Sequence, residues 1–255
     1  MKVLAINSSQ RHPSQSVTAT MLDQLVEGMT EAGAEVDLIS LRGKKIKSCR
    51  GCYTCMTETP GKCVIHDVMT EELFPMWLRA DVVTYATPLF HHLMNAPMKN
   101  FIERTYPICT PFFREKRSGR WNNPIRAKYP AAVVLAVGGY LDESAFSVLS
   151  HYANYLWGKS LIAEIYRPAA EFLIPMPGEK VADVLCATKQ AGKEIVENLK
   201  VSDETLASIT QPLSDIDTLL ESHNLFWKTC IDNAITPGTF GKRGMTVSPD
   251  LKMKS

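Results

Sequence analysis

The sequence lacks the long hydrophobic runs and the excess of one charge that would point to a membrane or to a nucleic acid. Its longest uninterrupted apolar run, Ala131–Val137, falls far short of the roughly 20 residues of a membrane-spanning helix. The 255 residues carry 28 Lys and Arg against 27 Asp and Glu, a net charge of +1 that removes the general electrostatic case for either partner. The first residues, Met1–Asn7, hold too few apolar side chains for a signal peptide. We therefore expect a cytoplasmic protein that binds neither nucleic acid nor membrane.

Cysteine is scarce in most of the chain but crowded in one window. The sequence has seven cysteines, an odd number that excludes a fully paired disulfide framework, and four of them lie between Cys49 and Cys63. In a reducing compartment, clustered cysteines more often serve metal or redox chemistry than disulfide bonds. The scattered Cys109, Cys186 and Cys230 are predicted to be ordinary buried thiols.

Several familiar motifs are also missing. No Gly-Lys-Ser/Thr follows the first predicted strand, no G-x-G-x-x-G is present, and no Ser/His/Asp triad or paired-carboxylate motif stands out. Instead, the hydroxyl-rich segment 7–18 leads into a helix, whose unpaired N–H groups and dipole favour an anion. Ser9, Ser16 and Thr18 offer hydroxyl donors and Arg11 offers a charge. The alternative is a solvated loop in which Ser16 only caps the helix.

Short apolar runs alternate with helical patterns over the first two hundred residues. Strands are predicted at residues 3–6, 35–41, 82–86, 131–137 and 171–174. Helices are predicted at residues 16–32, 69–80, 97–105, 144–157 and 181–199. Continuous apolar strands separated by helices indicate an α/β fold, a doubly wound five-stranded parallel sheet with helices on both faces. Ligands bind such sheets beyond the carboxyl ends of the strands.

The character of the chain changes near residue 200. Between residues 203 and 232 there are six acidic residues against one basic residue, Lys228, and the stretch from Pro237 onward has little periodicity. We predict a sheet domain at residues 1–199 and a C-terminal extension at 200–255, helical and then irregular. This extension is expected to pack on the sheet domain or on a second subunit.

Three segments, each after a predicted strand, resemble one known family. The loop after the first strand resembles the Gly-Ser-x-Arg-x-x-x-x-Ser/Thr phosphate loop of the flavodoxin-like NAD(P)H-dependent FMN reductases, with Ser8 in place of the glycine. Residues 86–90 and 95–99 look like the family's Thr-Pro-x-Tyr loop and Pro-x-Lys helix start, with Phe90 in place of the tyrosine. Residues 137–140 look like its second flavin-contacting loop.

The resemblance covers residues 1–199 and implies a flavodoxin-like fold with bound FMN. By this resemblance, the FMN phosphate would be held by Ser9, Arg11, Ser16, Val17 and Thr18. The isoalloxazine would be bordered by Thr87, Pro88, Leu89, Phe90, His91, His92, Gly138, Gly139 and Tyr140. The two histidines are weak catalytic candidates, as donors to a flavin carbonyl or a proton shuttle to N5, against the alternative of a surface pair. Phe90 is either a ring contact or simple core packing.

The cysteine window reads C-x2-C-x2-C-x7-C. Three cysteines at successive x2 steps can wrap three corners of a cubane, and a fourth closes it. Structural zinc prefers two C-x2-4-C knuckles with a longer spacer, so one compact run is a poorer match. The run resembles the motif of iron–sulfur flavoproteins, a branch of the same family, which implies a 4Fe–4S cluster on Cys49, Cys52, Cys55 and Cys63. The wider family has similar runs without an established cluster, and there the cysteines form a thiol-rich loop over the flavin.

Two basic segments are hidden within the balanced net charge. Residues 42–50 carry +5, and residues 114–128 carry six basic residues against Glu115, also +5. The first is interpreted as stabilising a reduced cluster, docking an acidic ferredoxin, or forming a solvated loop. The second is interpreted as gripping a nicotinamide nucleotide or an acidic protein, pairing with the acidic extension across a subunit interface, or forming a solvated loop.

The sequence therefore predicts a flavin-dependent oxidoreductase that uses FMN and a 4Fe–4S cluster to pass electrons from a donor such as NAD(P)H or ferredoxin to an acceptor. The alternative is a cluster-free NAD(P)H-dependent FMN or quinone reductase, and a third hypothesis is a zinc-stapled, non-catalytic binding module. The cluster segment follows the second strand, whereas the flavin sits over the first, third and fourth. In the family resembled, the cluster of one subunit approaches the flavin of another, so we expect a homodimer or homotetramer.

Overall fold

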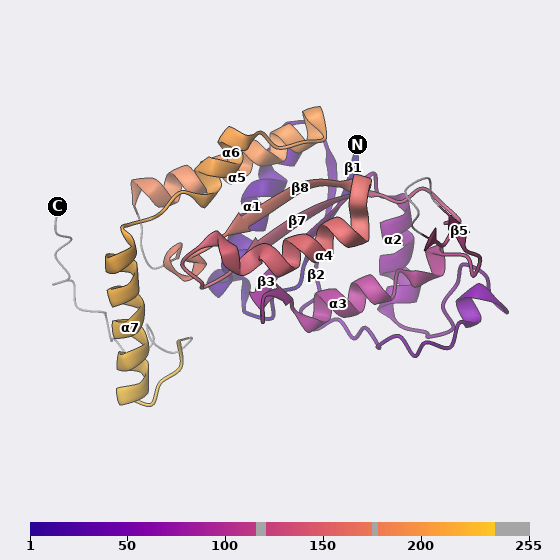
Figure 1. Cartoon of the computed structure of the whole chain (residues 1–255), viewed down its shortest axis with the longest axis horizontal. Helices are drawn as coiled ribbons and strands as arrows, with labels where there is room; N and C mark the ends of the chain where they lie inside the picture. Colours follow the sequence, from indigo (N-terminus) through magenta and orange to yellow (C-terminus); the bar gives the residue numbers. More distant parts are fainter. Residues whose placement is uncertain (116–120, 175–177, 238–255) are drawn as a thin grey trace.

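A parallel β-sheet with helices on both faces forms the body of the protein (Figure 1). The computed structural model describes residues 1–115, 121–174 and 178–237. The sheet runs in the order β2-β1-β3-β7-β8, with the short β4 paired antiparallel to β3. Its strands are β1 (Lys2–Asn7), β2 (Glu35–Ser40), β3 (Val82–Phe90), β4 (Leu93–Met94), β7 (Ala131–Val137) and β8 (Leu161–Arg167). This order is that of a flavodoxin-like doubly wound sheet, as the sequence predicts.

The predicted fifth strand at residues 171–174 is wrong. The fifth strand of the sheet is β8, Leu161–Arg167, whereas Ala170–Phe172 forms the 3-10 helix η7 after Ala169, whose φ is +47°. β8 pairs only with β7 and lies at the edge of the sheet. Its side chains are therefore buried in alternation, and it lacks the continuous apolar run by which the central strands were recognised.

Each face of the sheet is covered by its own set of helices (Figure 1). One face packs against α1 and α5, and the other packs against α2, α3 and α4. The helices are α1 (Val17–Glu31), α2 (Phe74–Arg79), α3 (Ala96–Glu103), α4 (Ser147–Trp157), α5 (Glu179–Asn198), α6 (Asp203–Thr210) and α7 (Ile216–Asp232). The shorter helices are η1 (Pro13–Gln15), η2 (Thr54–Met56), η3 (Met69–Leu73), η4 (Tyr106–Ile108), η5 (Glu143–Phe146), η6 (Gly158–Ser160) and η7. The predicted helix at 69–80 is thus divided, with a π-helical turn before α2.

Helices α1 and α5 meet with their backbones in direct contact. A Cβ atom on Gly28 would lie 1.8 Å from the carbonyl oxygen of Lys189, and one on Gly192 would lie 2.1 Å from that of Leu25. Real Cβ atoms do not approach other atoms so closely, so both positions require glycine. The pairing is reinforced at its surface, where Lys189 forms ion pairs with Glu27 and Glu31 of α1.

The C-terminal extension begins as part of the body and then leaves it. Helix α6 packs on α5, and its final carbonyl groups accept hydrogen bonds from the buried Arg167, 2.7 Å to Ile209 O and 2.8 Å to Gln211 O. Helix α7 projects from the left of the body in Figure 1, and it contacts the body through the buried Leu219 and through His223, which forms an ion pair with Glu171. The predicted irregular end, residues 238–255, lies outside the described residues.

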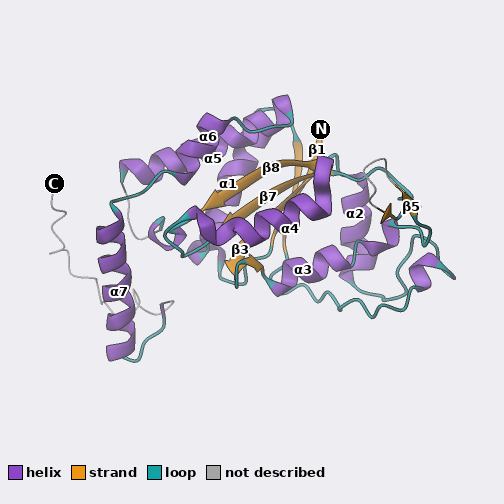
Figure 2. Ribbon diagram, in the orientation of Figure 1, coloured by secondary structure: helices purple, strands orange, loops and turns teal. Residues whose placement is uncertain are grey.

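A loop rather than a regular element follows β2 and carries the cysteines. Figure 2 shows residues 41–53 as an irregular chain that runs along the lower edge of the molecule towards its right end. The same end holds a two-stranded ribbon, β5 (Arg114–Glu115) and β6 (Trp121–Asn122). Residues 116–120, in the second predicted basic segment, lie outside the described residues. Among the residues that are described, no helix is both long and apolar enough to cross a membrane.

Candidate functional site: a loop cluster at the sheet edge and a cysteine pocket

The three loops predicted to hold FMN leave three neighbouring strands at the same edge of the sheet. Asn7 at the end of β1 is in register with Ala86 of β3, and Ala86 is in register with Leu135 of β7. The strands are parallel, so the segments at their carboxyl ends lie side by side: residues 8–16 after β1, residues 87–92 at the end of β3 and in its turn, and residues 138–140 after β7. The structure therefore brings together the residues that the sequence assigns to the phosphate and to the ring.

The loop after β1 is held by hydrogen bonds to the neighbouring strand β3. Ser8 is buried and donates to Ala86 O from its backbone N–H at 2.9 Å and from its hydroxyl at 3.1 Å. Ser16 caps α1, because its Oγ accepts a hydrogen bond from Ala19 N at 3.1 Å. The first-turn N–H groups of Val17 and Thr18 come before the first intrahelical hydrogen bonds and suit an anion. Ser16 is thus a helix cap whose hydroxyl hydrogen can still be donated.

Asn95 joins two of these loops and was missed by the site prediction. Its Nδ2 donates to Ser8 O at 2.8 Å, its N–H donates to Thr87 Oγ1 at 3.2 Å, and its Oδ1 caps α3 by accepting from Met98 N at 3.3 Å. Asn95 is 2% exposed. An Asn two residues before Pro97 is a recognisable helix-start signal, but the sequence does not show that its amide reaches a strand 87 residues away.

His91 and His92 form the tight turn between β3 and β4. Their φ values are +48° and +62°, as a two-residue type I′ hairpin requires. The ring of His92 stacks on Tyr140 with centroids 4.8 Å apart, and its Nδ1 lies 3.0 Å from Ala145 O. His92 therefore ties this hairpin to the loop after β7. Phe90, which precedes the turn, is 59% exposed and is not core packing.

The two glycines of the loop after β7 pack closely against neighbouring side chains. A Cβ atom on Gly138 would lie 3.2 Å from the Phe146 ring and 3.3 Å from the Leu89 side chain. One on Gly139 would lie 3.2 Å from Glu171 Oε2. Glu171 also forms an ion pair with His223 of α7. Its carboxylate therefore connects the C-terminal extension with this loop.

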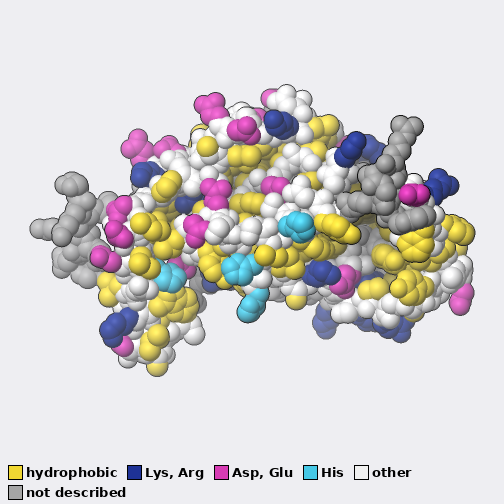
Figure 3. Space-filling view, viewed as in Figure 1, with side chains coloured by type: hydrophobic (Ala, Val, Ile, Leu, Met, Phe, Trp, Pro, Cys, Tyr) yellow, Lys and Arg dark blue, Asp and Glu magenta, His cyan; other side chains and the backbone are white. Residues whose placement is uncertain are grey.

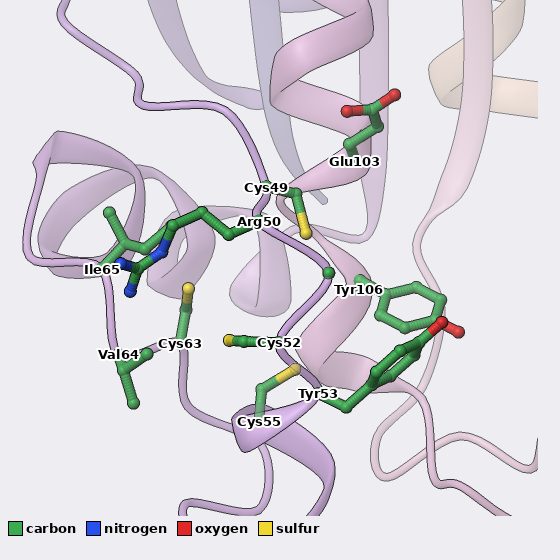
Figure 4. Close-up of a pocket in the computed structure, with 11 residues that line it drawn as sticks. Cys49, Arg50, Cys52, Tyr53, Cys55, Cys63, Val64, Ile65, Glu103 and Tyr106 are labelled. Carbon is green, nitrogen blue, oxygen red and sulfur yellow. The ribbon is translucent and has the colours of Figure 1, made fainter.

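The four clustered cysteines line one pocket at the other end of α3. It has a volume of about 320 Å³, and its wall includes Cys49, Cys52, Cys55 and Cys63. Figure 4 shows the four side chains around one hollow, with Arg50 on one side and the rings of Tyr53 and Tyr106 on the other. Gly51 and Tyr53 have φ values of +64° and +57°, and these left-handed residues turn the chain so that all four cysteines share the pocket.

The thiols of this pocket influence one another. Burial raises the pKa of the Cys55 thiol, and the other three cysteines raise it further because like charges repel. The hydroxyl of Thr54 lies 3.3 Å from Cys52 Sγ and lowers the pKa of that thiol. The ionised form of Cys55 is therefore disfavoured in the pocket unless a cation lies beside it.

The donor set of the pocket does not match a single metal ion. Within the described residues, no group of three or more His, Cys, Asp or Glu side chains is close enough together to hold one metal ion. Zinc would need its sulfur ligands about 2.3 Å from a common centre. A four-iron cluster binds each thiolate at a different corner and occupies more space. Four thiols spread around a pocket of this size are compatible with that larger group.

The first basic segment does not form one patch. Arg50 lines the cysteine pocket, whereas Arg42 donates to Gln10 O in the loop after β1 at 3.2 Å, and Lys44 pairs with Glu72 at 3.2 Å. Its charges are therefore divided between the two candidate sites. The prediction that the remaining cysteines are all buried is also wrong, because Cys186 is exposed on α5.

Comparisons with known proteins agree with this geometry. The family model described as NADPH-dependent FMN reductase matches residues 1–159. An iron-sulfur flavoprotein of Archaeoglobus fulgidus is 28% identical over 238 residues, covering 89% of this chain and 98% of that protein. The iron-sulfur flavoprotein MJ1083 of Methanocaldococcus jannaschii is 30% identical over 119 residues, covering 47% of this chain and 59% of that protein.

Solved structures share the fold at low sequence identity. The NAD(P)H:quinone oxidoreductase of Methanothermobacter marburgensis superposes with a TM-score of 0.54 at 17% identity, covering 76% of this chain and 96% of that one. An azoreductase of Bacillus anthracis gives 0.54 at 15% identity, covering 76% and 98%. The match over residues 1–159 extends across β1, β3 and β7 with all three edge loops and the cysteine segment. The chain therefore belongs to the NADPH-dependent FMN reductase family and is a flavin-dependent oxidoreductase.

Proposed function

We propose that this protein is an electron-transfer oxidoreductase that holds FMN at the sheet edge and a 4Fe–4S cluster in the cysteine pocket. The observation that carries the proposal is that all four cysteines of the C-x2-C-x2-C-x7-C run line one pocket. Full-length similarity to a protein named as an iron-sulfur flavoprotein supports it.

The FMN phosphate is assigned to the loop after β1. In this assignment Ser9, Arg11, Ser16, Val17 and Thr18 surround the phosphate with hydroxyl groups, N–H groups and one guanidinium. The sheet side of this loop is already held by Ser8, so little chain entropy is lost on binding.

The flavin ring is assigned to the loops after β3 and β7. Thr87, Pro88, Leu89, Phe90, His91 and His92 border it on one side, and Gly138, Gly139 and Tyr140 border it on the other. FMN supplies reversible one- and two-electron chemistry, and the chain binds, orients and shields it. The stack of His92 on Tyr140 joins the two sides of this border, which gives His92 a positioning role.

Anaerobic isolation followed by iron, sulfide and flavin assays tests both cofactors at once. We expect a visible spectrum with flavin and cluster absorption, about four irons and one FMN per chain. A colourless product without iron, sulfide or flavin after reconstitution would contradict the proposal.

A cluster-free NAD(P)H-dependent FMN or quinone reductase is the second candidate. It is favoured by the nicotinamide donor in the family description. Steady NAD(P)H oxidation by iron-free protein would support it, whereas electron uptake from ferredoxin without NAD(P)H oxidation would oppose it. The third hypothesis, a non-catalytic zinc module, is inconsistent with family membership.

The protein is further proposed to act as a homodimer or homotetramer in a reducing cytoplasm. The flavin loops and the cysteine pocket lie at opposite ends of α3, so an oligomer would bring the cluster of one copy to the flavin of another. Ile231 of α7 is 75% exposed and Phe112 beside β5 is 71% exposed. Figure 3 shows hydrophobic side chains on the surface at the left and at the right end of the molecule. Light scattering on the holoprotein tests this, and a monomer at working concentration would contradict it.

A further inference from the structure

A buried arginine at the C-terminal end of α3 binds the chain on both sides of the cysteine segment. Arg104 follows the last residue of α3, and its side chain is 1% exposed. Its Nη1 donates to Lys47 O at 2.6 Å, and its Nη2 donates to Ile65 O at 3.4 Å. Lys47 stands two residues before Cys49, and Ile65 stands two residues after Cys63. One guanidinium therefore holds the chain just outside both terminal cysteines.

Asp67 binds both Arg104 and the chain before Cys49. Its carboxylate accepts both Nη1 and Nη2 of Arg104, at 2.7 and 3.0 Å, and also accepts Lys47 N at 2.9 Å. The Asp67 side chain is 4% exposed, so the ion pair is shielded from solvent. Thr70 Oγ1 accepts a further bond from Nη2 at 2.9 Å.

The same helix also contacts the chain one turn earlier. Asn100 Nδ2 donates to Ile46 O at 2.6 Å, so α3 holds the incoming chain at two successive residues. No regular element covers residues 44–53, and these side-chain bonds replace a sheet or helix ladder there. The position of Cys49 relative to Cys63 thus depends on side chains of α3 and Asp67.

The charge of Arg104 acts on Cys63 as well as on Asp67. Burial opposes that charge, but the hydrogen bonds of Asp67 and the interaction with Cys63 outweigh burial and raise the pKa of Arg104. Arg104 Nε is buried and has no hydrogen-bond partner among the described residues. Arg50 and Glu103 are the charged residues on the pocket wall itself, and their charges cancel.

We propose that Arg104 is a positioning residue that sets the separation of the Cys49 and Cys63 ends of the cysteine segment and raises the reduction potential of the cluster they hold. The inference rests on the proposed function, because it concerns the cluster. A reduced cluster with four thiolates carries one more negative charge than the oxidised form. A fixed, desolvated cation beside Cys63 therefore favours the reduced state.

Two substitutions with opposite expected signs test the inference. In the holoprotein, Arg104→Gln removes the cation and leaves Asp67 unpaired, so the cluster potential becomes more negative. A tenfold change in the reduction equilibrium corresponds to about 59 mV for one electron. Asp67→Asn removes the anion and leaves Arg104 unpaired, so the potential becomes more positive. Both are measured by EPR-monitored redox titration, with the exposed Arg79→Gln as a control that leaves the potential unchanged.

A merely structural role would loosen the loop in both variants and shift the two potentials in the same direction, and that result would overturn the inference. Arg104→Lys keeps the charge but loses the two-pronged contact. It is expected to retain the wild-type potential while releasing iron to a chelator several-fold faster. If Arg104→Gln does not fold, a wild-type potential in Asp67→Asn would still overturn the inference.

The iron and sulfide content of the wild-type protein distinguishes a failure of the proposed function from a failure of the role proposed for Arg104. A wild-type protein that holds no cluster contradicts the proposed function. A wild-type protein that holds a cluster whose potential is insensitive to both substitutions leaves the proposed function standing and overturns the role of Arg104.

Discussion

The two ends of helix α3 hold candidate sites of very different construction. At its N-terminal end, Asn95 binds Ser8 in the loop after β1 and Thr87 near the end of the buried strand β3. At its last end, Arg104 binds chain without regular structure, in which Cys49 and Cys52 are exposed. Asn95 and Arg104 flank the 8 residues of α3, and at a rise of about 1.5 Å per residue they lie about 14 Å apart along the helix axis.

The difference shows two ways in which one sheet fold can prepare a site. The loops proposed to hold FMN are positioned by parallel strands whose register is fixed by the core of the sheet. The cysteine segment has no hydrogen-bond ladder of its own, so its position depends on the buried Arg104–Asp67 ion pair and on the cluster proposed to bind there. We therefore expect the cysteine segment to open at lower free energy than the flavin loops.

The largest expected effect comes from a substitution that disturbs the packing of α1 on α5, on which the whole sheet domain and therefore both candidate sites depend. Gly192→Ala places a Cβ against the backbone of α1 and should lower the free energy of unfolding by about 3 kcal/mol. FMN and iron should be lost together on urea titration. Gly178→Ala, where no described residue lies within 4 Å of the added atom, is the control and should cost less than about 1 kcal/mol. Equal effects of the two variants would show that contact between α1 and α5 is not what limits stability.

The next substitution should separate the two ends. Cys55→Ser removes a proposed cluster ligand without touching the sheet edge, so most iron should be lost while FMN remains. The exposed Cys186→Ser serves as the matched control and should keep both. Iron and flavin are assayed on anaerobically reconstituted protein. Loss of FMN together with iron would mean that the two ends are not independent.

A smaller effect is expected at the flavin end. Asn95→Ala removes the amide that joins the loops after β1 and β3 and also removes the cap of α3. FMN should bind about tenfold more weakly, a loss of about 1.4 kcal/mol. Fluorescence titration of apoprotein with FMN measures this. Asn154→Ala, on the exposed side of α4, is the control, and an equal loss there would exclude a specific role for Asn95.

The smallest effect concerns the C-terminal extension. His223→Ala removes the partner of Glu171, which packs beside Gly139 in the loop after β7. Because the pair is partly exposed, the dissociation constant of FMN should rise only about two- to threefold, with iron content unchanged. A change above tenfold would place α7 within the flavin site rather than beside it.

Much of the fold follows from local pattern. The strands at the centre of the sheet are continuous apolar runs, and the helices α1 and α5 repeat apolar residues on one face, so both were predictable. The edge strand β8 was missed because only one of its two edges is paired and its burial alternates. For the candidate sites, the phosphate loop and the cysteine run were visible as spaced residue types, whereas Asn95 and Arg104 were not.

The sequence by itself determined which chemical groups are available: the hydroxyl-rich loop, the glycines after β7 and four cysteines at cluster spacing. The order of the strands then placed the loops together, because parallel neighbours end at the same edge. Only the tertiary structure decided that α3 connects the two sites, and that Arg104 and Asp67 secure the cysteine segment. Those contacts join a side chain to backbone or carboxylate groups 37 to 57 residues away, and such pairings leave no periodic trace along the chain.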